Sequence, residues 1–173
     1  MKIYETKVEA GTKQWLKIPV DEECSLKAAA FCGSRPGKRL IVTAGVHGCE
    51  YIGILAVSRL IQELDPRQMK GEVVFLPIAN EGGFYKEIKQ LVPEDGVNLN
   101  RAFPGTEMGS RSAKIAAAVE TYLYPDADFL VDLHSGDIHE MVVPFAFFPV
   151  AAGETVEKKA AAAARAMSLS WRV

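Results

Sequence analysis

The sequence contains few of the residues that mark special classes of protein. Its 173 residues include only three cysteines and three histidines, and 20 lysines and arginines nearly balance 22 aspartates and glutamates, for a net charge of −2. Such a balance gives no reason to expect a nucleic acid or another polyanion as a partner. No apolar run approaches the roughly 20 residues of a membrane-spanning helix, and the first ten residues lack the apolar stretch of an export signal.

The cysteines indicate a compartment. Cys24, Cys32 and Cys49 form no CxxC pair. An odd number of cysteines without an export signal is typical of reduced thiols, so we expect a cytoplasmic protein. A disulfide between Cys24 and Cys32 is the alternative.

Apolar periodicity predicts alternating strands and helices along the chain. We expect strands at residues 1–10, 14–20, 26–32, 39–44, 72–78, 127–132 and 142–150, and helices at 50–64, 110–122 and 153–167. This order predicts an α/β fold of three layers with a mostly parallel central sheet. The first three strands lack intervening helices, so that edge should be antiparallel.

The length and composition predict how the chain is divided. A chain of 173 residues that is 49% hydrophobic can build one domain over residues 1–173. The chain stops where a further core strand is expected to begin, near residue 168. This indicates a domain truncated at its C-terminus, and the exposed sheet edge would favour association into a homo-oligomer.

Two of the three histidines follow predicted core strands. Residues 40–50 read LIVTAGVHGCE and place His47 and Glu50 after one strand, and His134 follows another. Carboxyl ends of parallel strands meet at one sheet edge, so the three side chains can converge. His, Glu and His form the ligand set of a catalytic zinc ion, one per chain, with a fourth position for water. Asp132 is a candidate acceptor for an imidazole N–H.

Other interpretations of these residues carry less weight. A single histidine such as His47 is more often structural, and only the second histidine at a strand end favours a metal. His139 follows no core strand and is expected at the surface. Cys49 as a thiol nucleophile is disfavoured because adjacent positions at a helix start point apart. Ser135 lacks the GxSxG context of a serine hydrolase.

A polar segment at residues 93–105 has little apolar periodicity, which is typical of a functional loop. It contains NLNRAFPG at residues 98–105. Asn100 and Arg101 suit the recognition of a substrate carboxylate, because a guanidinium group offers a planar pair of donors. An arginine paired with a structural acid is the alternative.

Three motifs in order resemble those of a known family. GVHGCE, NLNRAFPG and DLHSG, with FLPIAN at residues 75–80, resemble the succinylglutamate desuccinylase/aspartoacylase family, whose zinc enzymes are related to the zinc carboxypeptidases. The resemblance covers most of residues 40–167 and implies a zinc exopeptidase-like fold. It implies hydrolysis of the amide bond of N-acyl amino acids, or of a related carboxylate-bearing amide or ester. The residues it implies are the zinc ligands His47, Glu50 and His134 and the carboxylate-binding pair Asn100 and Arg101.

The chain departs from the family pattern at three places. The family's general base is a glutamate expected beyond Val173, so the catalytic base is unknown. Lys89 and Gln90 stand where relatives often carry an arginine that polarises the scissile carbonyl. Asn98 stands where relatives often carry aspartate. The alternative function is therefore a metal- and carboxylate-binding fragment, or a degenerate homologue, without turnover.

Overall fold

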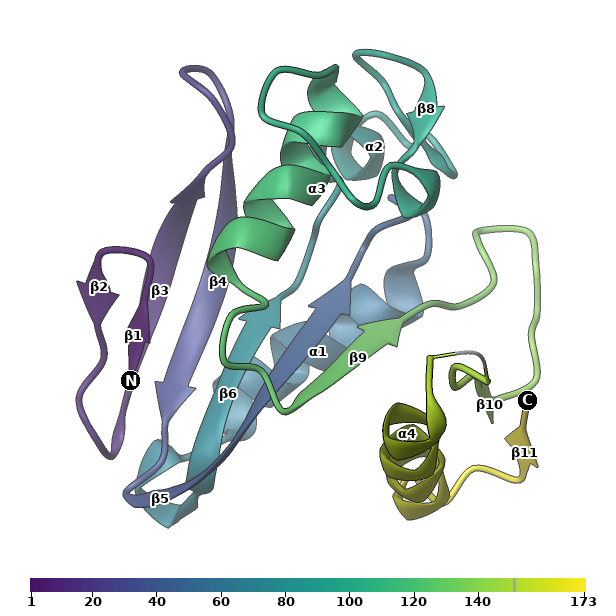
Figure 1. The fold of residues 1–173 in the computed structure, drawn as a ribbon. Helices are drawn as coiled ribbons and strands as arrows, with labels where there is room; N and C mark the ends of the chain where they lie inside the picture. The colour runs from purple at the N-terminus through teal and green to yellow at the C-terminus, as the bar shows by residue number, and fades with distance from the viewer. Residues whose placement is uncertain (151) are drawn as a thin grey trace. The chain divides into compact units, whose positions relative to one another are not determined.

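Five strands form the central sheet of the computed structural model, which describes residues 1–150 and 152–173. In spatial order they are β3 (Thr12–Pro19), β4 (Ser25–Cys32), β6 (Lys70–Leu76), β5 (Arg35–Ala44) and β9 (Phe129–Leu133). The ladders from β6 to β5 and from β5 to β9 are parallel, and those from β3 to β4 and from β4 to β6 are antiparallel. Figure 1 shows this mixed sheet, which confirms the predicted parallel centre and antiparallel edge.

Two helices cover the opposite faces of the sheet (Figure 1). One face carries α3 (Arg111–Tyr122) and the other carries α1 (Tyr51–Glu63). Successive strand residues alternate between the two cores: Val74 packs in the cluster that contains Ile115 of α3, and Phe75 in the cluster that contains Ile54 of α1. The later parts of β5 and β6 are mostly apolar because both of their faces are buried. This is the predicted three-layer architecture.

The remaining elements are short, apart from one helix. Within Met1–His139 they are β1 (Lys2–Ile3), β2 (Thr6–Lys7), a 3₁₀ turn (Pro66–Gln68), α2 (Glu81–Tyr85), β7 (Leu91–Val92), β8 (Val97–Asn98) and η2, the 3₁₀ turn Leu99–Arg101. Glu140–Val173 contains β10 (Phe145–Ala146), α4 (Glu154–Ala166) and β11 (Trp171–Arg172). These two segments are separate compact units, and a single domain over the whole chain stays a prediction.

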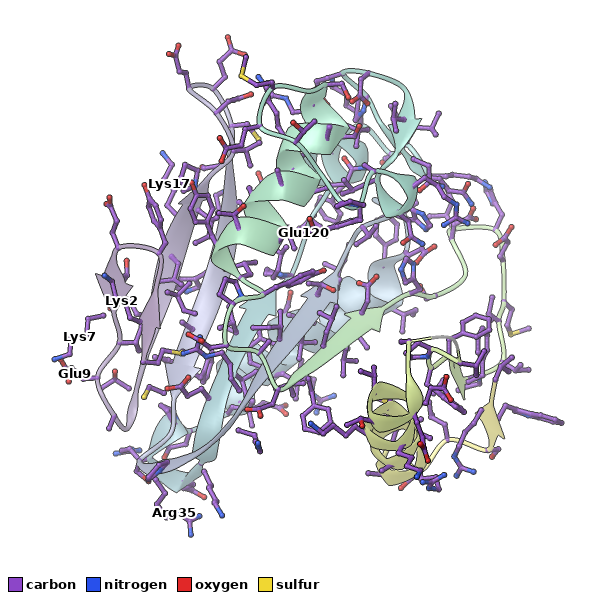
Figure 2. The ribbon with its side chains drawn as sticks, viewed as in Figure 1. Lys2, Lys7, Glu9, Lys17, Arg35 and Glu120 are labelled. Atoms are coloured by element: carbon purple, nitrogen blue, oxygen red, sulfur yellow. The ribbon has the colours of Figure 1, made fainter. Side chains whose placement is uncertain are left out.

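The N-terminal strand prediction is wrong in detail. Residues 1–10 form the antiparallel β1–β2 hairpin, which is a sheet of its own and does not join the central sheet. Tyr4 turns the chain with a positive φ of 51°, and its ring packs edge-on against Tyr122 at 4.8 Å. Figure 2 shows Lys7 and Glu9, which form a 2.8 Å ion pair, on the outer side of this hairpin.

Two strand predictions fail for reasons of position. Strand β5 begins at Arg35 rather than 39, because its start pairs with β6 before a register irregularity between Arg35 and Arg39. Strand β9 was predicted as a core strand, but it lies at an edge of the central sheet among the described residues, and its Phe129 and Leu130 are exposed.

The C-terminal strands also differ from the prediction. The strand expected at 142–150 is only β10, and the strand expected from 168 is only β11. They pair with each other in a parallel two-stranded sheet instead of extending the central one. None of the described helices is long and apolar enough to cross a membrane. The three cysteines are free thiols, and the cytoplasmic location and homo-oligomer stay predictions.

Candidate metal centre

A glycine-rich loop places His47 and Glu50 at the carboxyl end of β5. Gly45 turns the chain with a φ of +62°. A Cβ at Gly48 would lie 2.3 Å from the backbone of Gly83, so only glycine fits where this loop passes the start of α2. Glu50 is the residue before α1 and makes no capping bond with its side chain. Its carboxylate is therefore available to the two histidines.

His134 follows the parallel neighbour of β5, and a close helix–strand contact brings it to Glu50. Strand β9 ends at Leu133, which lies directly against Gly53 of α1. A Cβ at Gly53 would be 3.0 Å from both the Cβ and the carbonyl oxygen of Leu133. The missing side chain allows α1 to approach the end of β9, so that Glu50 and His134 meet.

The two carboxylate oxygens of Glu50 each face one histidine. Oε1 lies 2.7 Å from Nδ1 of His47, and Oε2 lies 2.8 Å from Nδ1 of His134. The Ser135 backbone N–H donates to Oε2 at 3.0 Å. His47 and Glu50 are buried, and the two imidazole rings lie 4.9 Å apart edge to face. The sequence prediction that these three side chains converge is thus met by the geometry.

The charges of the cluster are strongly coupled. Burial raises the pKa of the Glu50 carboxyl, but hydrogen bonds from His134 and His47 outweigh it and bring the pKa to about 2. Hydrogen bonds to Asp132 and Glu50 raise the pKa of His134 to about 10 against the effect of burial. Since a metal ligand must give up its proton, metal binding at His134 would release one.

The three side chains fit one small divalent ion. One ligand atom from each of His47, Glu50 and His134 lies within 4.8 Å of the others. Ligand atoms at about 2.1 Å from a tetrahedral zinc ion lie roughly 3.4 Å from one another, so the three side chains would draw somewhat closer around a bound ion. Two imidazole nitrogens and one carboxylate oxygen form a donor set typical of catalytic zinc, with one coordination position left for water.

His47 and His134 each contact a further hydrogen-bond acceptor outside the cluster. Asp132 accepts from Nε2 of His134 at 2.8 Å, and its other oxygen accepts from Oγ1 of Thr43 at 2.6 Å. This is the contact predicted for Asp132. Nε2 of His47 lies 3.1 Å from Oδ1 of Asn98. Such outer contacts orient metal-binding histidines. The sequence identified Asn98 only as a departure from the family pattern and did not predict this contact.

The anchor loop, η2 (Leu99–Arg101), follows Asn98 directly. Leu99 is completely buried, whereas Asn100 and Arg101 are exposed. Nη1 of the Arg101 guanidinium donates to the carbonyl oxygen of Asn100 at 3.3 Å. Among the described residues no carboxylate lies within ion-pair distance of Arg101, which favours an anchoring role over the structural alternative.

The other candidates are not members of the His47, Glu50 and His134 cluster. Cys49 is buried, with the hydroxyl of Tyr51 at 3.9 Å from its sulfur. His139 is exposed, as expected. Lys89, at the place of the family arginine, forms a 2.8 Å ion pair with Asp137 in the loop after His134.

Comparison with known proteins decides the family. The sequence pattern of the succinylglutamate desuccinylase/aspartoacylase catalytic domain matches residues 36–173. The chain belongs to this family. The match contains all three predicted ligands and the anchor loop, and it confirms the resemblance drawn from the motifs.

Individual relatives agree with this assignment. The chain is 32% identical over 164 residues to the N-alpha-acetyl-L-2,4-diaminobutyric acid deacetylase of Halomonas elongata, covering 92% of this chain and 48% of the relative. A succinylglutamate desuccinylase from Silicibacter has a similar structure, with a TM-score of 0.80, 28% identity, and coverage of 93% of this chain and 50% of that one. The product-bound ectoine utilization protein EutE (DoeB) from Ruegeria pomeroyi has a TM-score of 0.78 and 27% identity, with coverage of 93% of this chain and 51% of that one. The chain thus spans about half the length of these relatives.

Proposed function

We propose that this chain carries the zinc site and carboxylate anchor of a hydrolase that cleaves the amide bond of N-acyl amino acids, or of a related carboxylate-bearing amide or ester. The observation that carries the proposal is the convergence of His47, Glu50 and His134 at the carboxyl ends of β5 and β9. The family match supports a deacylase chemistry for this site.

The metal is proposed from the donor set. His47, Glu50 and His134 would hold one zinc ion, which when bound lowers the pKa of a water molecule and polarises a carbonyl group. Asp132 holds the ring of His134, and its carboxylate strengthens that imidazole as a ligand. Glu50 bridges both rings with separate oxygens, which fixes the distance between them.

The anchor is proposed from η2. Asn100 and Arg101 would bind the carboxylate of the substrate and so place its amide group at the metal centre. Positioning of this kind can remove several kcal/mol from the activation barrier. The general base is proposed to be a glutamate beyond Val173, as the family resemblance implies.

The relatives suggest which substrates to test first. A relative at 32% identity is named as a deacetylase of N-alpha-acetyl-L-2,4-diaminobutyric acid, and the family is named for succinylglutamate and acylated aspartate. Each of these compounds carries an acylated amine beside a free carboxylate, which is the chemistry that η2 and the metal centre would recognise together.

The test is whether the zinc-loaded protein hydrolyses these three compounds. Hydrolysis is measured as the release of acetate or succinate. Arg101→Ala should lower kcat/KM by about 10- to 100-fold, which corresponds to the roughly 1.5–3 kcal/mol of a hydrogen bond to a charged group. The matched control is Arg59→Ala, because Arg59 is exposed on α1 and pairs with Glu63 of the same helix.

The outcomes separate the two candidate functions. Hydrolysis that requires zinc and falls in Arg101→Ala but not in Arg59→Ala supports the enzyme. Binding of the compounds that depends on zinc and Arg101 without hydrolysis, measured by calorimetry, supports a binding fragment or degenerate homologue. Equal activity of Arg101→Ala and the parent would overturn the anchor.

A further inference from the structure

Asn98 lies between the candidate metal centre and the anchor loop. Its side-chain oxygen Oδ1 is 3.1 Å from Nε2 of His47 and 2.9 Å from the backbone nitrogen of Asn100. His47 belongs to the metal centre, and Asn100 belongs to η2. A single oxygen atom therefore contacts both parts of the proposed site.

The contact with Asn100 settles the orientation of the Asn98 amide. A backbone N–H can only donate, so the atom that faces it is the carbonyl oxygen and not the amide nitrogen. The same oxygen must then accept from His47, which places a hydrogen on Nε2 of that ring. Nδ1 of the same ring donates to Oε1 of Glu50 at 2.7 Å, and a metal bound at Nδ1 would replace that hydrogen.

The loop around Asn98 is held firmly by the rest of the fold. Asn98 pairs with Leu91 in the β7–β8 ladder, and the next residue, Leu99, is completely buried. Asp95, in the turn between these strands, accepts from the backbone nitrogen and the hydroxyl of Ser112 at 2.7 Å each. Asn98 is thus fixed by its own hairpin and can hold His47 in place.

His134 offers an internal comparison. Its Nε2 contacts Asp132, and Asp132 is held in turn by Thr43 of β5. In the part of the chain that the structure describes, no hydrogen bond or ion pair joins Asp132 to η2. Both histidines therefore have an outer acceptor, and among the described residues it is the acceptor of His47 that also holds the anchor loop.

We propose that Asn98 is a positioning residue that sets the His47 ring and the loop η2 with one oxygen atom, and so couples metal binding to the order of the carboxylate anchor. The inference rests on the proposed role of His47 as a metal ligand. Because a coupling between two sites acts in both directions, zinc should also slow hydrogen exchange at the Asn100 amide.

The test compares three variants: Asn98→Ala removes the shared acceptor, Asn98→Asp keeps it, and Asp132→Ala removes the acceptor of His134 alone. Zinc affinity is measured by competition with a chromophoric chelator. Exchange of the Asn100 amide and the ¹⁵N shifts of the His47 ring are measured by NMR, with and without zinc. Circular dichroism checks that each variant is folded.

Asn98→Ala should lower zinc affinity by about 10- to 100-fold, as removal of such outer contacts typically does. It should also speed exchange at Asn100 several-fold and change the ¹⁵N pattern that marks hydrogen on Nε2 of His47. Asn98→Asp should keep the zinc affinity, the exchange at Asn100 and the ¹⁵N pattern of His47 close to those of the parent. Asp132→Ala should lower zinc affinity and leave exchange at Asn100 unchanged.

The contradicting results are equally specific. If Asn98→Ala speeds exchange but binds zinc as tightly as the parent, Asn98 is only a turn residue and the coupling is wrong. If Asn98→Ala weakens zinc binding without changing hydrogen exchange at the Asn100 amide, the proposed link to η2 is wrong. A parent that binds no zinc would overturn the proposed function, and the metal-free exchange and ¹⁵N data would still decide whether Asn98 holds His47 and η2 together.

Discussion

At the scale of single residues, the site depends on side chains whose polar atoms each have at least one partner. Glu50 divides its two oxygens between two histidines, and Asp132 divides its oxygens between His134 and Thr43. No buried side-chain nitrogen or oxygen among the described residues lacks a hydrogen-bond partner. Loss of one partner in such a network leaves another polar group unsatisfied, which costs about 1–3 kcal/mol for a buried group.

A residue-scale prediction concerns the pH dependence of stability. The Arg111 guanidinium donates to Asp21 at 2.6 Å, and with the backbone N–H groups of Glu23 and Cys24 it lowers the pKa of Asp21 to about 2. A carboxyl with a lowered pKa in the folded state stabilises above its unfolded pKa of about 3.9, and this contribution is lost as the pH falls toward 2.

Asp21→Asn should therefore unfold more easily than the parent near neutral pH, and the difference should shrink as the pH falls from about 4 to about 2. The difference in the free energy of unfolding is measured by urea unfolding, monitored by circular dichroism, at several pH values. Asp126→Asn is the control, since Asp126 is exposed and lies 3.4 Å from Arg39, and it should change little. A difference that stays constant with pH would contradict this account of Asp21.

At the scale of elements, the close approach of α1 to β9 sets the distance between Glu50 and His134. Gly53 permits that approach, because a Cβ there would meet Leu133 at 3.0 Å. Gly48 likewise permits the His47 loop to approach Gly83, because a Cβ at Gly48 would lie 2.3 Å from the carbonyl carbon of Gly83. The glycines of this region are thus explained by contacts that form only in the folded chain.

Gly53→Val should push α1 away from the end of β9, lower the free energy of unfolding by about 1–3 kcal/mol, and weaken zinc binding. Ala56→Val is the matched control because Ala56 is exposed on the same helix, so it shares the cost of a β-branched residue without the contact. Urea unfolding and chelator competition measure both effects. Equal zinc affinity in the two variants would show that the Gly53 contact does not position Glu50.

The elements also show what sequence patterns can predict. The runs at 40–44 and 72–78 predicted β5 and β6 because both faces of these strands are buried, and the histidines that follow β5 and β9 located two of the candidate ligands. The position of β9 at the edge, the hairpin formed by residues 1–10 and the acceptor role of Asn98 depend on contacts between distant segments. No local pattern contains that information.

At the scale of the whole molecule, the three ligand candidates and the anchor loop lie in one compact unit. Met1–His139 contains the three ligand candidates, the anchor loop and both core clusters. Glu140–Val173 forms the second unit. Metal binding should therefore depend on the first unit alone.

A chain of residues 1–139 should bind zinc with the same stoichiometry as the chain of 173 residues. Circular dichroism would establish that it is folded, and titration with zinc in competition with a chelator would give stoichiometry and affinity. A folded 1–139 chain without a zinc site would show that residues of the second unit are needed.

The most direct measurement is the zinc content of the purified and reconstituted chain by elemental mass spectrometry. The parent is compared with His134→Ala, and with His139→Ala as the control, because His139 is an exposed histidine outside the cluster. We predict about one zinc ion per chain in the parent and in His139→Ala, and loss of zinc in His134→Ala. A parent without zinc, or an equal zinc content in His134→Ala, would contradict the metal centre.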